Sequence, residues 1–530
     1  MKIKRVNKNN FLLNIFVSII VLTPIYIVLY KIYIPHISSF GCFDECMNYG
    51  GGYFISQGKS LYSQIFFNHQ PIAGFLSFFV QKLTHPSNLY EFLLKHGQAV
   101  LLFGFIFNIF IVARYKIAGF LFVVFYELSK YYLFGNRFLA ESFIVYPIVY
   151  LAGLMFFLET KQKIYRVEFV LTAVFSWFVL FMREPFAFVA IFQLLFILRN
   201  PNTKVKKLSY LIFGLLTLIS LITLPLNEYL FSILTVSYKG TLANEANSTN
   251  LYGIGILKVL FYPFYSLFFG KWNEFRILLV GFSAIFSISG VFLLLLKRYK
   301  LVFLSIFLLG LLNIRYVLPG TIFYSAFHMM DWFGVIILFT FLFLEELRKK
   351  EAVLSTLLYG FIFITLFMYL SNPNNFIRHN INQQEEFLTN FGPSYSLGET
   401  VKALSTPDQT FFIDGGNDDL NVSYWVSQRT SPYQYSWFVY FAPGFQRYID
   451  ARDEMFTQNP PDFYYGKISK GVDTETSLPN SIADKYIRLN SNGKKSNLFM
   501  KKNIVRSVSN DQWNKAKEFG IDKPKDLIRN

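Results

Sequence analysis

The chain has 530 residues, of which 53% are hydrophobic, 20% aromatic and 16% charged. Soluble domains carry about a quarter charged residues and fewer apolar ones, so this composition excludes an ordinary soluble protein. The net charge of +17 lies mainly in short segments between apolar runs. This distribution follows the positive-inside rule of membrane proteins and argues against a nucleic-acid-binding protein.

The chain begins with a basic segment, MKIKRVNKNN, and an apolar run follows at 11–34. That run is too long for the hydrophobic part of a signal peptide and lacks a small-residue cleavage site. We therefore expect an uncleaved first span with its basic end in the cytoplasm. Further apolar runs, comparable to or shorter than the roughly 20 residues that cross a bilayer, lie at 71–84, 92–113, 117–134, 138–158, 166–182, 185–198, 207–226, 276–296, 301–314, 329–345 and 352–370.

Basic linkers separate many of these runs and mark the cytoplasmic side. They contain Arg114 and Lys116; Lys161, Lys163 and Arg166; Lys204, Lys206 and Lys207; Lys297, Arg298 and Lys300; and Arg348, Lys349 and Lys350. Because the chain must return between successive linkers, 71–113 crosses only once, and the short run 71–84 is expected to be a re-entrant or interfacial helix. The predicted bundle has about 11 spans, with 13 as the upper limit, and lies in the plasma membrane with its N-terminus inside.

From residue 371 onward the composition becomes polar and rich in turn residues. Short alternating runs at 410–416, 462–468 and 486–491 predict strands, and the segments 380–390 and 510–519 predict helices. The predicted fold is thus a polytopic α-helical membrane domain at 1–370, with a first outer loop at 35–70, followed by a small extracytoplasmic α/β domain at 371–530.

The first outer loop contains the stretch GCFDECMNYGGGY, residues 41–53. The chain has only two cysteines, Cys42 and Cys46, so there is no disulfide framework. Their spacing of four leaves a bridge open, but we expect unpaired packing residues on one helix face. The three glycines at 50–52 are expected to let the loop turn back.

On this topology, ionisable residues gather at the outer end of the bundle, where a charge is costly and is kept for pairing or function. A carboxylate there can act as general base towards an acceptor hydroxyl, and an arginine suits a phosphate leaving group. The candidate residues are Asp44, Glu45, His69, Arg137, Glu141, Arg183, Arg315 and His328.

Each candidate also has a simpler structural explanation. Asp44 and Glu45 could be favourable charges at a helix N-terminus. Arg137 and Glu141, four residues apart, could form an ion pair on one helix face. Arg183 could reach the membrane interface, and His328 could be a packed histidine of the bundle. Their common location therefore carries more weight than any single residue.

The order of these features resembles the GT-C superfamily of polytopic glycosyltransferases, in the branch of protein O-mannosyltransferases and lipid A aminoarabinose transferases. Asp44 and Glu45 precede YFISQGKSLYSQIFFNHQP (53–71), which looks like the first-loop motif of that branch. NRFLAES resembles its arginine-plus-acid motif at a helix start, and FMREP stands where its basic residue–proline hairpin would be. The polar tail resembles the outer α/β domain of some members.

The resemblance implies a transferase that moves a sugar from a polyprenyl-phosphate donor to an acceptor at the outer membrane face, with inversion at the anomeric carbon. Asp44 would be the base and Glu45 its supporting partner. Arg137, Arg183 and Arg315 would hold the lipid phosphate. Arg183 replaces the lysine usual at this hairpin and is followed by an acid, which weakens phosphate binding there.

Two other functions stay open on the sequence: a transporter or flippase of lipid-linked sugars, and a non-catalytic subunit of envelope assembly. Transporters show internal repeats and ionisable residues near the bilayer midplane, and neither pattern is evident here. The carboxylates of Asp44 and Glu45 could admit Mg²⁺ or Mn²⁺, but no metal is predicted. The expected partners are a polyprenyl-phosphate-linked sugar, the lipid bilayer and a glycan, lipid or protein acceptor.

Overall fold

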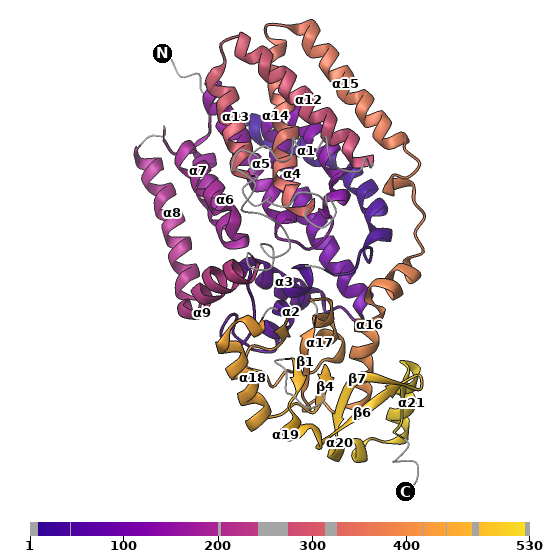
Figure 1. Cartoon of the computed structure of the whole chain (residues 1–530). Helices are drawn as coiled ribbons and strands as arrows, with labels where there is room; N and C mark the ends of the chain where they lie inside the picture. The colour runs from indigo at the N-terminus through magenta and orange to yellow at the C-terminus, as the bar shows by residue number, and fades with distance from the viewer. Residues whose placement is uncertain are drawn as a thin grey trace, which may run out of the picture. The chain divides into compact units, whose positions relative to one another are not determined.

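The computed structural model describes residues 9–42, 44–199, 203–241, 274–312, 326–416, 418–440, 442–468 and 476–524. The chain divides into two compact units (Figure 1). The first unit comprises residues 1–37, 97–220 and 245–381, and the second comprises 38–96, 221–244 and 382–530. Segments of the first outer loop and of the polar tail thus belong to one unit. The expected Arg315 lies outside the described residues.

The first unit is a helical bundle. In the described part of the chain, seven helices are long and apolar enough to cross a membrane, which confirms the predicted class of protein; the expected number of spans stays a prediction. The helices lying wholly or mainly in this unit are α1 (Asn9–Tyr33), α4 (Leu89–Glu127), α5 (Glu141–Glu159), α6 (Arg166–Met182), α7 (Ala187–Ile197), α8 (Thr203–Ile222), α12 (Glu274–Leu295), α13 (Tyr299–Leu312), α14 (Met330–Arg348) and α15 (Ala352–Ser371), with short 3₁₀ helices η1 (Ile34–His36), η2 (Lys130–Leu133), η3 (Glu184–Phe186), η6 (Ala326–Met329) and η7 (Phe376–Arg378).

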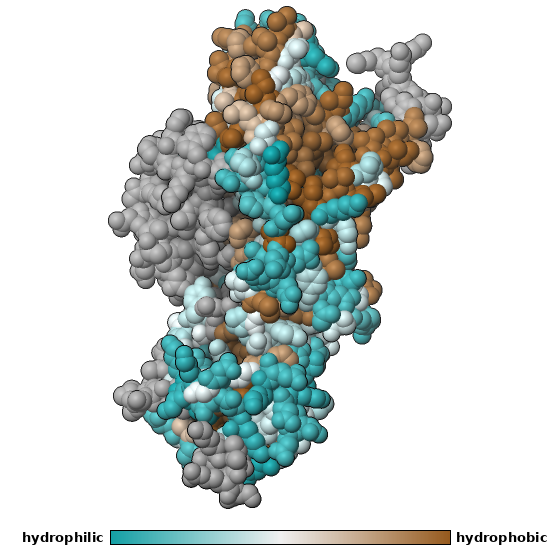
Figure 2. All heavy atoms as spheres, turned by 90° about the vertical axis from the view of Figure 1, so that its right-hand side faces the viewer, coloured by the Kyte–Doolittle hydropathy of each residue, from teal (hydrophilic) through white to brown (hydrophobic). Residues whose placement is uncertain are grey.

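Helices α5 and α14 form the centre of this unit. Their apolar windows are each 94% buried, whereas that of α8 is only 6% buried. The two central helices approach closely at Gly334, where an added Cβ would lie 2.8 Å from Val145 Cγ2. Several helices of this unit expose broad apolar surface, much of which Figure 2 shows in brown. Apolar surface of this extent needs a hydrocarbon environment.

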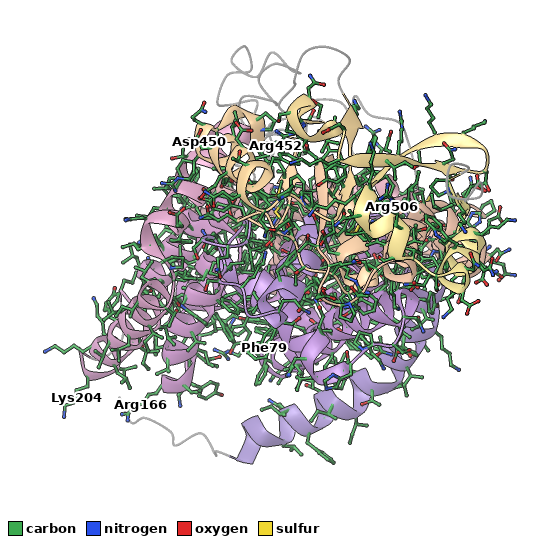
Figure 3. All side chains as sticks on the ribbon, turned by 90° about the horizontal axis from the view of Figure 1, so that it is seen from below. Phe79, Arg166, Lys204, Asp450, Arg452 and Arg506 are labelled. Carbon is green, nitrogen blue, oxygen red and sulfur yellow. A yellow bond between two sulfur atoms is a disulfide. The ribbon has the colours of Figure 1, made fainter. Side chains whose placement is uncertain are left out.

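The basic linker predicted between two spans near Lys116 marks a break within α4. The backbone leaves the helical region at Lys116, with φ 53° and ψ −121°. The two halves then pack tightly, since a Cβ at Gly119 would lie 2.5 Å from the carbonyl oxygen of Ile111. Other basic linkers also lie at helix ends: Figure 3 shows the labelled side chains of Arg166 and Lys204, in the first turns of α6 and α8, pointing away from the bundle.

The second unit is built around a six-stranded sheet in the order β2-β1-β3-β7-β6-β8. Its strands are β1 (Phe411–Gly416), β2 (Phe438–Val439), β3 (Phe463–Tyr465), β6 (Tyr486–Ser491), β7 (Lys494–Lys501) and β8 (Ile521–Asp522), and β4 (Lys467–Ile468) pairs separately with β5 (Ser477–Leu478). Its helices are α2 (Asp44–Ser56), α3 (Pro71–Thr84), α9 (Leu226–Leu230), α16 (Gln383–Leu404), α17 (Val422–Ser427), α18 (Gln446–Gln458), α19 (Asn480–Ala483), α20 (Lys502–Ser507) and α21 (Asn510–Glu518), together with the π-helix η4 (Phe231–Thr241) and the 3₁₀ helices η8 (Asp418–Asn421) and η9 (Ala442–Gly444).

Strand β1 is parallel to β2 and β3, and β7 is antiparallel to β3 and β6. The three predicted strands correspond to β1, to β3 with β4, and to β6, and the two predicted helices correspond to α16 and α21. A buried ion pair ties α18 to the sheet: Arg452 Nη2 lies 2.6 Å from Asp414 Oδ2, and the Tyr464 hydroxyl donates to the same oxygen at 2.9 Å. Figure 3 labels Arg452 on this helix.

Candidate functional site

The predicted acidic pair lies in the first turn of α2, within the second unit. The Asp44 side chain is 27% exposed, whereas Glu45 is buried with 1% exposure. Both carboxylates are near the helix N-terminus, where the unpaired backbone N–H groups favour negative charge. The two acids thus have different environments, and Asp44 is the one that a solute can reach.

His69 lies beside Asp44. The His69 Nε2 atom is 3.6 Å from Asp44 Oδ2, a distance of ionic attraction rather than of an ordinary hydrogen bond. Two tyrosines hold the segment that carries His69: the Tyr62 hydroxyl donates to the His69 carbonyl oxygen at 2.8 Å, and the Tyr229 hydroxyl donates to Gln70 Oε1 at 2.9 Å. The start and the end of the first loop therefore meet at this acid–imidazole pair.

The expectation of unpaired cysteines was wrong. A disulfide joins Cys42 to Cys46, with their Cα atoms 5.6 Å apart, a separation typical of such bonds. Only Cys46 lies within α2, because the helix begins at Asp44. The bridge thus fixes the chain on both sides of Asp44 and Glu45 and limits the positions that the acids can adopt.

The three glycines that follow the acids do not form a turn, contrary to the expectation from sequence. Gly50, Gly51 and Gly52 lie inside α2 and are buried. A Cβ at Gly52 would lie 2.6 Å from the backbone nitrogen of Phe78 in α3, and a Cβ at Gly50 would lie 3.0 Å from Trp437 Cζ3. Their function is therefore close packing, which lets α3 and the polar tail support the helix that carries the acids.

The remaining described candidates belong to the first unit. Arg183, which directly follows the last residue of α6, lies with its Nε atom 2.9 Å from Glu141 Oε1, and both side chains are buried. Arg137 lies in the turn before α5 and not on that helix, so the expected helical face shared with Glu141 is wrong. The guanidinium of Arg137 lies over the Phe134 ring, 5.8 Å from its centre.

His328 is a buried residue of η6, and its ring centre lies 4.0 Å from that of Phe327. Within the second unit, then, the structure brings Asp44 and His69 together. Within the first unit it brings Glu141 and Arg183 together. That all these residues form one site stays a prediction.

Asp331, in the first turn of α14, was missed by the sequence reasoning. Its side chain is fully buried, and in the described part of the protein neither carboxylate oxygen has a hydrogen-bond partner. It interacts electrostatically with Glu141 and Arg183. A signal was present in the sequence, because Asp331 is the only charged residue between His328 and Glu345.

The described residues contain no group of three or more His, Cys, Asp or Glu side chains that could hold a metal ion. Asp44 and Glu45 are two possible ligands, of which Asp44 is partly exposed and Glu45 is buried. We therefore derive no step that requires a metal.

The fold defines this chain as a multi-helix membrane protein with a small sheet near its C-terminus. No family model, no curated protein and no solved structure matches the chain.

Proposed function

We propose that this protein is a membrane glycosyltransferase that transfers a sugar from a polyprenyl-phosphate donor to an acceptor at the outer face of the membrane. The observation that carries the proposal is the partly exposed Asp44 carboxylate, 3.6 Å from His69 and followed by a disulfide-bonded Cys46. A carboxylate that is held in place yet reachable is what a general base requires.

In the proposed reaction, Asp44 takes the proton of an acceptor hydroxyl while the hydroxyl oxygen attacks the anomeric carbon of the sugar. The bond between that carbon and the phosphate oxygen breaks, and the polyprenyl phosphate leaves with the electron pair. Attack opposite to the leaving group inverts the anomeric configuration. His69 would orient the Asp44 carboxylate, and the buried Glu45 would support the helix start.

The leaving phosphate needs positive charge, and Arg137, Arg183 and Arg315 are the proposed source. The ion pair between Arg183 and Glu141 bears on this assignment, because Glu141 engages the Arg183 Nε atom at 2.9 Å. A guanidinium that is already paired on one edge carries less net charge towards a phosphate. Among the proposed arginines, Arg183 is thus expected to orient the phosphate more than to neutralise it.

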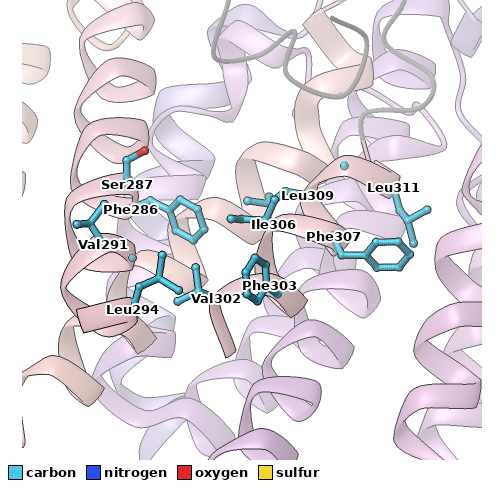
Figure 4. Close-up of a pocket in the computed structure, with 12 residues that line it drawn as sticks. Phe286, Ser287, Val291, Leu294, Val302, Phe303, Ile306, Phe307, Leu309 and Leu311 are labelled. Carbon is cyan, nitrogen blue, oxygen red and sulfur yellow. The ribbon is translucent and has the colours of Figure 1, made fainter. Parts of the chain in front are cut away.

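The first unit contains an apolar cavity that could hold part of the polyprenyl chain of the proposed donor. It lies between α12 and α13 in the first unit and has a volume of about 710 Å³. Figure 4 shows its apolar lining, which includes Phe286, Val291, Leu294, Phe303, Ile306 and Phe307. Such a lining accepts a section of hydrocarbon chain without an unpaired polar group.

The test compares Asp44→Asn with Asp511→Asn. Asp511 is a matched control because it is also an acid in the first turn of a helix of the second unit. Mass analysis of lipid-linked and envelope glycans in cells that lack the protein first identifies donor and acceptor. With these, Asp44→Asn should lower turnover by about 10²- to 10⁴-fold with donor binding retained, and Asp511→Asn should be normal. Full transfer by a folded Asp44→Asn protein would rule out the assigned base.

A further inference from the structure

The packing of the helical bundle does not explain why an acid stands at position 331. The Asp331 carboxylate is fully buried, and neither of its oxygens has a hydrogen-bond partner in another described residue. A buried acceptor that is left without a hydrogen-bond partner keeps the full desolvation cost of its burial. Nearly all residues of α14 are buried, and an apolar side chain at this position would avoid that cost.

Near Asp331, two acidic side chains face one basic side chain. Arg183 is paired with Glu141 at 2.9 Å, and Asp331 interacts electrostatically with both. Two carboxylates thus share one guanidinium. A protein that needed only a structural ion pair would have no use for the second acid.

The hydroxyl of Tyr126, on α4, is a further unused polar group near Asp331. It is buried, has no hydrogen-bond partner in the part of the chain described, and interacts electrostatically with Glu127 and, less strongly, with Asp331. The Tyr126 hydroxyl can donate a hydrogen bond, and the Asp331 oxygens can accept one. Together they suit a ligand that both donates and accepts hydrogen bonds. A sugar hydroxyl group has both properties.

The three charged residues lie at corresponding helix ends. Glu141 begins α5, Arg183 follows the last residue of α6, and Asp331 is in the first turn of α14. The opposite ends of α6 and α14 carry Arg166 and Arg348, which belong to basic linkers. By the positive-inside rule, these charges lie at the outer end of the bundle, where the proposed donor presents its sugar.

We propose that Asp331 binds the sugar of the lipid-linked donor, accepting hydrogen bonds from its hydroxyl groups next to the Glu141–Arg183 pair. The inference rests on the proposed function, which it deepens by assigning a sugar-binding residue. Asp331 is a binding residue in this assignment, and Asp44 keeps the role of base.

The test measures binding to the full-length protein in detergent with two probes, a polyprenyl phosphate carrying a hexose and the same polyprenyl phosphate without sugar. Asp331→Ala should weaken binding of the sugar-bearing probe by about 10- to 100-fold, the loss expected when hydrogen bonds to a buried acceptor are removed. Binding of the bare probe should stay unchanged. Asp331→Asn, which keeps the volume and one acceptor oxygen, is the second variant and should show a smaller loss.

Glu345→Gln, at the other end of α14, is the control and should bind both probes like the wild type. If the wild type binds the sugar-bearing probe and both folded Asp331 variants bind it equally well, the inference is wrong while the proposed function stands. If the wild type binds neither probe, the proposed function fails and the inference with it.

Discussion

Single residues of the first unit show two kinds of buried charge. Lys130 Nζ lies 2.7 Å from Glu127 Oε2, and both side chains are completely buried. The Tyr146 hydroxyl and the Asn108 amide each donate to Glu127 Oε1 at 2.8 Å. Both oxygens of Glu127 are thus engaged within this closed group, Oε2 by the ion pair and Oε1 by hydrogen bonds. In the described segments the Asp331 oxygens have no such neighbours at contact distance, so we assign the Glu127 group a structural role.

The closed group predicts a non-additive effect on stability. Lys130→Met removes the cation and leaves the Glu127 carboxylate buried without its charge partner, which should cost about 3–5 kcal/mol of unfolding free energy. Adding Glu127→Gln removes the charge but keeps an acceptor for Tyr146 and Asn108, so the double variant should recover most of the loss. Unfolding midpoints in detergent measure this, and a double variant as unstable as Lys130→Met would refute the structural role.

The environment of a site residue could be predicted from the sequence only where residues next to it in the chain determine that environment. The acids at the start of a helix are of this kind, because Asp44 and Glu45 follow a turn. The partner of Glu141 is not, since Arg183 is 42 residues away and belongs to another helix. Local spacing suggested Arg137 on the same helix face, but Arg137 lies in the irregular turn before α5.

At the scale of elements, the contact between α2 and α3 decides how the acids are held. Gly52 lies at the closest approach, where a Cβ would be 2.6 Å from a backbone nitrogen and 2.7 Å from Ser77 Oγ. A backbone atom cannot move aside as the end of a long side chain can. The helix that carries Asp44 is therefore fixed against α3 by the absence of a side chain.

This packing predicts opposite effects for two glycine-to-alanine changes in helices of the second unit. Gly52→Ala should destabilise by about 1–3 kcal/mol through overpacking. Gly392→Ala, in α16, should be neutral or stabilise by up to about 1 kcal/mol, because the nearest atom to its Cβ is 4.0 Å away and alanine favours the helix. Thermal unfolding of the two variants is the measurement, and equal midpoints would contradict the close contact.

Elements with a regular pattern were predictable and the others were not. Strands β1, β3 and β6 were found from their composition and alternation. Strand β7 was missed because its first half, Lys494 to Asn497, is mostly exposed and its second half is mostly buried, so that no alternation exists. The break in α4 was expected from its charges, while the close packing at Gly119 depends on a contact that no local pattern encodes.

The orientation of the whole molecule in the membrane is predicted from the positions of its basic segments and of its apolar helices. The exposed apolar helices need lipid, and the basic segments at helix ends favour the cytoplasmic side. On this basis we predict that residues 371–530 lie outside the cell, a compartment in which a disulfide such as Cys42–Cys46 persists. The two arguments are independent and agree.

The disulfide also makes the orientation measurable. Both cysteines of the chain are bonded to each other, so a cysteine introduced at an exposed site should be the only one to react with a membrane-impermeant maleimide. Lys517→Cys in α21 should be labelled on intact cells. Lys350→Cys, in the basic segment after α14, should be labelled only after the cells are opened, because the positive-inside rule predicts this segment on the cytoplasmic side. The reverse pattern would invert the topology and separate Asp44 from the outer face on which the proposed transfer depends.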